Sequence, residues 1–426
     1  MTAFASREKA EALDRTDPLR SVRDRFDLPE TDPPTIYLDG NSIGPLPRAV
    51  RERVRTCVEE EWGRDLIASW NKAGWIDLPA SVGARIAPLI GAEPDRVRVC
   101  DSTSVNLFKV LAAALALRPD RRGIVAQRGN FPTDLYIAEG VGGLMDRRLQ
   151  TVDTDGADDI EATIEAALGH DTAVLLLTHV DYRDGRMLDM ARLTRAAHEA
   201  GALVVWDLAH SAGAVPVDLA GARADFAVGC GYKYLNGGPG APAFLYVAPD
   251  RDDAANPLSG WFAHTAPFAF EPDFRAASSV DRFLVGTPPV LSTVAFDAAL
   301  DLWNDVSMAD VRAKSVALTE RFIALAESRC AGHGLALATP REPNMRGSQV
   351  SFRHPHAYPI VSALIERGVI GDFRAATDGG NGIARFGFAP LFLRQVDVWD
   401  AVEVLSDVLE TRAWDAARHH ERKAVT

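Results

Sequence analysis

Short apolar runs alternate with helical segments between residues 97 and 248, and this alternation constrains the fold more than any other feature of the chain. The run 172–180 (TAVLLLTHV) is almost continuously apolar, as is the run 202–210 (ALVVWDLAH). Between them, 193–201 (LTRAAHEAG) has a helical pattern that ends at a glycine. Strands buried on both faces have this composition, and two of them joined by a helix form a βαβ unit. The pattern predicts a parallel sheet with helices on both faces.

The same rhythm appears on either side of this unit. Strand-like runs at 97–100, 123–127, 224–231 and 242–248 accompany an apolar helix at 106–117. The last two runs flank a polar, glycine-rich loop, YKYLNGGPG. The sequence therefore extends the predicted sheet over about 150 residues.

From about residue 291 the pattern changes to long amphipathic helices at 293–306 and 309–330, a strand-like run at 349–354 and a final helix. A chain of 426 residues also exceeds the length at which one core stops growing. We expect an N-terminal arm or small-domain segment at 1–44, a large domain at 45–290 and a small α+β domain at 291–426.

Charge and composition narrow the class of protein. The net charge of −13 and the isoelectric point near 5.3 disfavour binding to nucleic acid or to an anionic membrane, because both need clustered basic residues. We expect no secretory signal, because the N-terminus carries acidic residues early and has no apolar h-region. We expect no membrane span, because no apolar run approaches the roughly 20 residues that a span needs. Four scattered cysteines form no CxxC pair, which is compatible with a reducing cytoplasm.

No metal site is expected either. The sequence has no HExxH or similar ligand spacing, and the pair His419–His420 has the pattern of a solvated helix end. The glycines at 229–231 and 237–240 lack the strand-to-helix GxGxxG context of a dinucleotide site.

Three residues around the glycine-rich loop indicate a different chemistry. Asp207 ends a predicted parallel strand, where open α/β sheets bind their ligands, His210 follows three residues later, and Lys233 lies in the loop. An enzyme that uses pyridoxal 5′-phosphate needs a lysine amine to form an imine and an acid that keeps the pyridine nitrogen protonated. The order strand, Asp-x-x-His, strand, Tyr-Lys predicts such a cofactor site.

Three motifs carry a family resemblance. The segments 207–213 (DLAHSAG), 231–240 (GYKYLNGGPG) and 38–47 (LDGNSIGPLP) resemble kynureninases, within the aminotransferase class V branch of fold-type I enzymes. The similarity covers about residues 36–395. It implies a mainly parallel seven-stranded sheet with a smaller α+β C-terminal domain, and a homodimer whose active site is shared across the interface. It also implies hydrolysis of the Cβ–Cγ bond of L-kynurenine to anthranilate and L-alanine in tryptophan degradation.

The resemblance assigns cofactor contacts residue by residue. It makes Lys233 the imine lysine, Asp207 the partner of the pyridine nitrogen and His210 a further contact. Tyr232 contacts the phosphate and is also the candidate acid that protonates Cβ. The remaining implied contacts are Thr103 and Ser104 at the phosphate, Phe131 stacked on the ring, Asp134 beside it, and Trp261 and Thr287 from the neighbouring subunit.

Substrate contacts follow in the same way. Arg385, in NGIARFGFAPLF, corresponds to the arginine that binds the α-carboxylate of the substrate, which suits the two parallel hydrogen bonds of a guanidinium. Asn41, Ser42 and Trp70 are expected to line the substrate pocket. Trp70 and Thr287 stand where the animal pattern has His and Asn, which favours L-kynurenine over its 3-hydroxy derivative.

Two alternatives remain open. A cysteine desulfurase or selenocysteine lyase of the same branch needs a nucleophilic cysteine on a mobile C-terminal loop, whereas Cys330 is predicted at a helix end. A non-catalytic cofactor-binding sensor would carry a basic DNA-binding domain, and an N-terminal arm of about 35 residues is too short for one.

Overall fold

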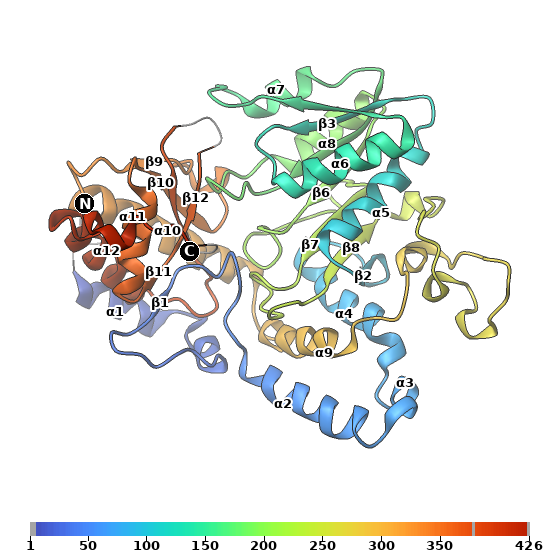
Figure 1. The fold of residues 1–426 in the computed structure, drawn as a ribbon, viewed down its shortest axis with the longest axis horizontal. Helices are drawn as coiled ribbons and strands as arrows, with labels where there is room; N and C mark the ends of the chain where they lie inside the picture. The colour runs from blue at the N-terminus through green and yellow to red at the C-terminus, as the bar shows by residue number, and fades with distance from the viewer. Residues whose placement is uncertain (1–5, 377–379, 424–426) are drawn as a thin grey trace.

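Seven strands form the main sheet, in the spatial order β2, β8, β7, β6, β5, β3, β4. The structure is a computed structural model that describes residues 6–376 and 380–423. The strands are β2 (Val97–Val99), β3 (Gly123–Gln127), β4 (Arg148–Val152), β5 (Thr172–Thr178), β6 (Leu203–Asp207), β7 (Phe226–Cys230) and β8 (Ala243–Val247). Only β8 is antiparallel to its neighbours within this described sheet. The predicted seven-stranded, mainly parallel sheet is confirmed (Figure 1).

Adjacent residues of the central strands pack against helices on opposite faces of the sheet. Trp206 of β6 lies in the same buried cluster as Leu193 of α8 (Met190–Glu199). Its neighbour Val205 lies in the cluster that contains Val110 of α5 (Thr103–Ala116). This alternation explains why the strand sequences are apolar at every position rather than at every second one.

The remaining helices of this part complete the two layers. Helix α6 (Pro132–Met145) packs beside α5, and α7 (Ile160–Ala166) packs beside α8. Helices α2 (Arg48–Thr56), α3 (Ser69–Lys72) and α4 (Leu78–Ile86) lie below the sheet in Figure 1. Helix α9 (Val290–Ala299) packs against α2 and α4, and the predicted helix 293–306 continues past it only as the short 3-10 turn Leu300–Trp303.

A second group of elements lies beside the sheet, on the left in Figure 1. It contains a four-stranded sheet in the order β12 (Asp372–Arg374), β13 (Ile383–Gly387), β10 (Gln349–Arg353) and β9 (Ala336–Leu337). Helices α10 (Met308–Arg329), α11 (Ala357–Glu366) and α12 (Gln395–Glu410) pack around it. This matches the α+β character predicted for the C-terminal part of the chain.

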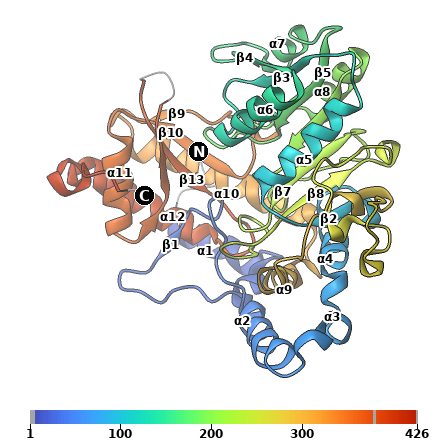
Figure 2. The same cartoon turned by 45° about the vertical axis from the view of Figure 1, so that its right-hand side comes forward.

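The N-terminal segment joins this second group. Helix α1 (Arg7–Thr16) packs against α12, and strand β1 (Ile36–Tyr37) pairs in parallel with β11 (Val369–Ile370). The chain then crosses to α2 beside the main sheet, as Figure 2 shows from a second direction. The motif 38–47 therefore lies between the two groups.

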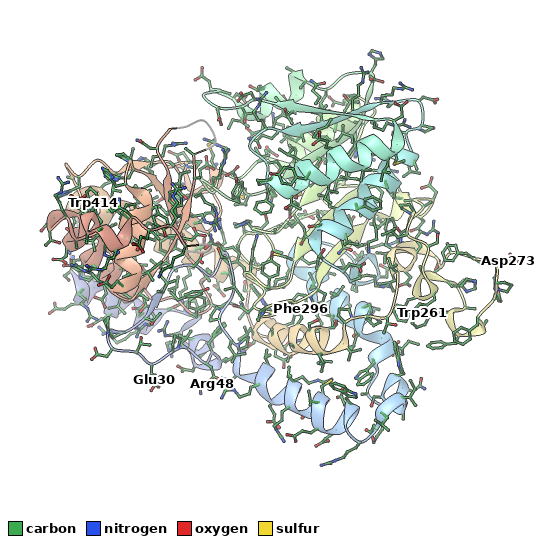
Figure 3. The ribbon with its side chains drawn as sticks, viewed as in Figure 1. Glu30, Arg48, Trp261, Asp273, Phe296 and Trp414 are labelled. Atoms are coloured by element: carbon green, nitrogen blue, oxygen red, sulfur yellow. The ribbon has the colours of Figure 1, made fainter. Side chains whose placement is uncertain are left out.

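Residues between β8 and α9 form a long segment with short 3-10 turns, which projects from the molecule at the right of Figure 1. Trp261 lies near its base and Asp273 at its tip (Figure 3). Phe268, Phe270 and Phe274 on this segment are 52%, 78% and 46% exposed. None of the described helices has the length and apolar character that crossing a bilayer requires.

Candidate active site

A cavity of about 210 Å³ opens at the carboxyl ends of β5, β6 and β7. Eight of the side chains predicted from the sequence line it together, although they are spread over 130 positions of the chain. They are Thr103, Ser104, Phe131, Asp134, Asp207, His210, Tyr232 and Lys233. The strand ends bring these residues together because parallel strands finish at the same edge of the sheet.

Two carboxyl groups, those of Asp134 and Asp207, meet in the wall of this cavity. Both side chains are almost fully buried, and they are hydrogen bonded to one another. Burial, reinforced by the charge of Asp207, raises the pKa of Asp134 well above its ordinary value. Burial also raises the pKa of Asp207, but the cationic Lys233 and the Ala209 N–H, 2.7 Å away, favour its charged form. The pair therefore carries one negative charge, centred on Asp207, with Asp134 as the donor.

Lys233 lines the same cavity as this charge and interacts with it electrostatically. Its Nζ is 3.0 Å from Nε2 of His210. Burial and the nearby Lys233 lower the pKa of His210 well below its ordinary value, so the imidazole is neutral and accepts a hydrogen bond from the ammonium. The hydrogen-bond partner of Lys233 Nζ is thus a neutral imidazole rather than a carboxylate.

Helix α5 supplies the opposite end of the cavity. Ser102 caps the helix by accepting a hydrogen bond from the Val105 N–H, and Thr103 and Ser104 begin the first turn. The first N–H groups of a helix have no partner within it, and the helix dipole is positive at this end. The first turn of α5 therefore presents unpaired N–H groups and a positive dipole end toward the cavity that Thr103 and Ser104 line.

The glycine-rich loop is held by the N-terminal motif. The Gly44 N–H donates to the Tyr232 carbonyl at 2.8 Å. A Cβ atom at Gly44 would lie 2.5 Å from the carbonyl oxygen of Lys233, so a larger residue would displace this loop. Cys230 and burial raise the pKa of the Tyr232 phenol, which keeps its proton at neutral pH.

Arg385 is buried on β13, and its guanidinium already has several partners. Nε donates to Asp372 Oδ1 at 2.7 Å, and Nη2 donates to Asp372 Oδ2 and, at 2.9 Å, to Ser42 Oγ. Nη1 donates to the carbonyl of Tyr182 at 2.5 Å, and Tyr182 lines the Lys233 cavity. Arg385 and Ser42 thus adjoin the cavity without lining it.

Four of the predicted site residues lie outside the lining of the Lys233 cavity. Asn41 is fully buried, with its side chain packed against Gly387. Trp70 packs against Trp261, with ring centroids 6.2 Å apart, and neither lines the Lys233 cavity. Thr287 is exposed just before α9.

Several residues of the site were not predicted. Thr178 ends β5 and donates to Asp134 Oδ2 at 3.3 Å. Its position at a strand end is the same signal that identifies Asp207. Tyr182 packs edge-to-face on Phe131, with ring centroids 5.1 Å apart. Tyr182 and Asp372 lie on segments without a comparable pattern in the sequence.

The described residues, 6–376 and 380–423, contain no group of three or more His, Cys, Asp or Glu side chains suited to a metal ion. All four cysteines are free and buried, and none of them lines the Lys233 cavity.

Comparisons with solved structures support the fold. A cysteine desulfurase from Thermococcus onnurineus NA1 has a TM-score of 0.75 at 20% identity, covering 92% of this chain and 98% of its own. A mutant of C-DES with glycine linked covalently to its PLP cofactor has a TM-score of 0.76 at 19% identity, covering 88% and 96%. At such identities the likeness shows the fold, which agrees with the predicted class V architecture.

Sequence comparisons are more specific. A family model described as the kynureninase C-terminal domain matches residues 311–405. The kynureninase of Burkholderia mallei (strain SAVP1) is 53% identical over 429 residues, covering 99% of this chain and 100% of that protein. The kynureninase of Pseudomonas fluorescens is 49% identical over 428 residues, with the same coverage. Because relatives named kynureninase match this chain from end to end at about half of all positions, the chain belongs to the kynureninase family.

Proposed function

We propose that this chain is a pyridoxal 5′-phosphate-dependent hydrolase that cleaves the Cβ–Cγ bond of L-kynurenine to give anthranilate and L-alanine. Full-length similarity to kynureninases supports this reaction. The observation that carries it is the single cavity that holds Lys233, the Asp134–Asp207 pair and the first turn of α5. A role in tryptophan degradation through kynurenine follows from the same activity.

The donor set of the cavity fits the cofactor. The first turn of α5, with Thr103 and Ser104, suits the phosphate dianion. Asp207 suits a protonated pyridine nitrogen, because the pair that it forms with Asp134 holds one negative charge. Lys233 is the amine for the imine, His210 fixes that amine, and Phe131 is the stacking ring. When bound, the cofactor supplies an electron-withdrawing ring that stabilises negative charge at the carbons next to the amino group.

The proton transfers are assigned to Lys233 and Tyr232. Lys233, freed as an amine when substrate binds, removes the proton on Cα. Cleavage of the Cβ–Cγ bond consumes one water molecule, whose oxygen stays on the aryl carbonyl carbon as part of the anthranilate carboxylate. Tyr232, whose phenol stays protonated, delivers a proton to Cβ once this bond is broken, and also contacts the phosphate. Arg385 binds the α-carboxylate, with Ser42 hydrogen bonded to its guanidinium. Asn41, buried against Gly387, supports the same end of the substrate pocket from behind.

We further propose a homodimer in which Trp261 and Thr287 complete the cofactor site of the other subunit and Trp70 its substrate pocket. The lining of the Lys233 cavity in their own chain, which includes none of these three residues, supports this. So does an apolar groove of about 470 Å³ whose lining begins directly after Thr287; it is lined by Cys57, Trp62, Trp75, Pro288, Pro289, Val290, Leu291 and Ser292. Trp70 and Thr287 favour L-kynurenine over 3-hydroxykynurenine.

We also propose that the chain divides into an N-terminal segment 1–44, a large domain 45–290 and a small domain 291–426. We propose a cytoplasmic location without nucleic-acid or membrane partners.

The direct test is incubation of the protein, saturated with pyridoxal 5′-phosphate, with L-kynurenine and with 3-hydroxykynurenine side by side. We expect anthranilate fluorescence with the first, a slower reaction with the second, and loss of both in Lys233→Ala. L-Cysteine is the matched control for the desulfurase alternative, and we expect no sulfur release from it. Protein that gives no anthranilate, or that forms no borohydride-trapped adduct at Lys233, contradicts the proposal.

Tyr232→Phe tests the second proton transfer. The variant lacks the phenol proton but keeps the aromatic ring. We expect turnover to fall by about 100-fold or more, the usual effect of losing one general acid. The visible absorbance of the bound cofactor should stay close to that of the wild type. Turnover at the wild-type rate excludes Tyr232 as the acid.

A further inference from the structure

We infer that Asp372 is a positioning residue that orients Arg385 for the α-carboxylate of the substrate. This inference rests on the function proposed above. Asp372 lies on β12 and Arg385 on β13, directly opposite one another in the antiparallel pair. Neither the sequence pattern nor the comparisons assign a role to Asp372.

The geometry of the guanidinium carries the argument. Asp372 accepts from Nε and from Nη2, so it occupies one lateral edge of the planar group with both of its oxygens. Such a bidentate contact fixes the plane as well as the position of an arginine. Among the residues that the structure describes, the hydrogen-bond acceptors at the remaining edge, between Nη1 and Nη2, are both neutral: the Tyr182 carbonyl and the Ser42 hydroxyl.

This second edge is the one that adjoins the Lys233 cavity. Tyr182 lines the cavity, and the charge of Arg385 contributes to the lowered pKa of His210 within it. A substrate carboxylate can replace the two neutral acceptors without a loss of charge pairing, because those acceptors carry no charge. The Ser42 hydroxyl, 3.0 Å from Asp372 Oδ2, links the two edges.

Charge balance around the pair supports the same role. Arg374 lies 2.6 Å from Asp372, and the carboxyl of Asp39 faces the same group of side chains. Asp372, with 4% of its side chain exposed, thus lies between the guanidinium groups of Arg374 and Arg385. Of these two groups, Arg385 must also attract the carboxylate of the substrate. Without Asp372, Arg385 would be free to turn toward Asp39 rather than toward the substrate.

The test compares two small ligands that differ only in the carboxylate. L-Alanine, a product of the proposed reaction, and L-alaninamide are titrated into holoenzyme, and dissociation constants are read from the absorbance of the bound cofactor. In the wild type we expect L-alanine to bind about 10- to 100-fold more tightly, the usual effect of a charge-assisted bidentate contact. In Asp372→Asn we expect the two constants to differ by no more than about threefold, since the oriented contact is lost.

Two further variants keep the test decisive. Asp397→Asn removes a comparable buried aspartate, paired with Arg394 in the same part of the molecule, and should keep the preference for L-alanine. The double variant Asp372→Asn/Arg374→Gln restores the charge balance in case the single variant does not fold, and should also lose the preference. A preference at the wild-type level in either Asp372 variant overturns the inference.

Failure of the proposed function gives a different result. Wild-type protein that releases no anthranilate from L-kynurenine contradicts that function, whatever the variants do. Wild-type protein that is active and prefers L-alanine, together with an Asp372 variant that keeps the preference, contradicts the role of Asp372 alone.

Discussion

At the scale of single residues, the site depends on carboxyl groups that differ in charge because their surroundings differ. Asp207 is stabilised as an anion by Lys233 and a backbone N–H, whereas its neighbour Asp134 is kept neutral by burial and by that anion. Two identical side chains in contact thus have opposite roles, one as acceptor and one as donor. Substituting each aspartate in turn distinguishes the role of the acceptor from that of the donor.

Asp207→Asn and Asp134→Asn form a matched pair. An amide at position 207 cannot hold a positive charge on the pyridine nitrogen, so we expect turnover to fall by at least about 100-fold, in the range of other lost electrostatic contacts. An amide at position 134 still donates a hydrogen bond, so we expect turnover within about tenfold of the wild type. Steady-state rates with L-kynurenine check both, and equal losses in the two variants would contradict the assignment of the charge.

Asp39 gives a prediction about pH. Burial, and then the charge of Asp372, raise its pKa from the ordinary 3.8 to about 7. The folded protein therefore holds a proton that the unfolded chain has released, so this stabilising contribution is present at low pH and is lost as the pH rises through about 7. Asp39→Asn removes the effect.

We expect the thermal midpoint of Asp39→Asn to approach that of the wild type near pH 5 and to exceed it by a few degrees near pH 8. Differential scanning calorimetry across this range measures the difference. A difference that stays constant with pH would mean that Asp39 does not titrate in this window.

At the scale of elements, one buried lysine joins three segments. Lys109 of α5 is fully buried, and its Nζ donates to Asp101 Oδ2 and to the Phe283 carbonyl, both at 2.7 Å. Asp101 precedes the first turn of α5 and has φ +49°, in the left-handed region. Phe283 belongs to the turn Ser279–Phe283, which leads to Thr287. The residue before the first turn of α5 and the segment before α9 are thus held by one side chain.

Lys109→Met keeps the length of the side chain and removes the charge. We expect the free energy of unfolding to fall by about 2–4 kcal/mol, because a carboxylate and a carbonyl lose a buried partner. Cofactor affinity should fall as well, since Asp101 is released. Urea denaturation of the apoprotein and a cofactor titration measure these two effects. Lys314→Met, at the buried contact with Asp17, is the control that should lose stability alone.

At the scale of the whole molecule, the segment between β8 and α9 projects from the rest of the chain and exposes aromatic side chains (Figure 1). Phe270 is 78% exposed there, and Phe268 packs on Trp70 and Trp261 at its base. Exposed aromatic residues in one segment are typical of an interface rather than of a solvated loop. This agrees with the proposed homodimer.

Phe270→Asp tests the surface. A charge in an apolar interface is costly, so we expect the dimer dissociation constant to rise by at least about tenfold. Leu13→Asp is the control, because Leu13 is 47% exposed on α1, at the opposite end of the molecule (Figure 1). Sedimentation velocity over a range of concentrations distinguishes the two. Equal dissociation in both variants would place the interface elsewhere.

The sequence by itself determined the features that depend on near neighbours in the chain. The apolar runs of β5 and β6, the glycine after α8, Asp207 at a strand end and Lys233 among glycines each have a local physical cause, and each was predicted. The three motifs at 38–47, 207–213 and 231–240 also indicated the family to which the chain belongs. Strand ends then bring residues as distant as Thr103 and Lys233 to one edge of the sheet.

Only the tertiary structure decided the features that depend on which distant groups meet. No periodic signal predicts the reversal of β8, the contact of Asp372 with Arg385, the packing of Tyr182 on Phe131 or the packing of Trp70 on Trp261. The reason is physical: a hydrophobic period records burial, whereas the partner of a buried charge is chosen by long-range packing. The chemistry of this protein was therefore predictable from its residues, and the orientation of the Arg385 guanidinium was not.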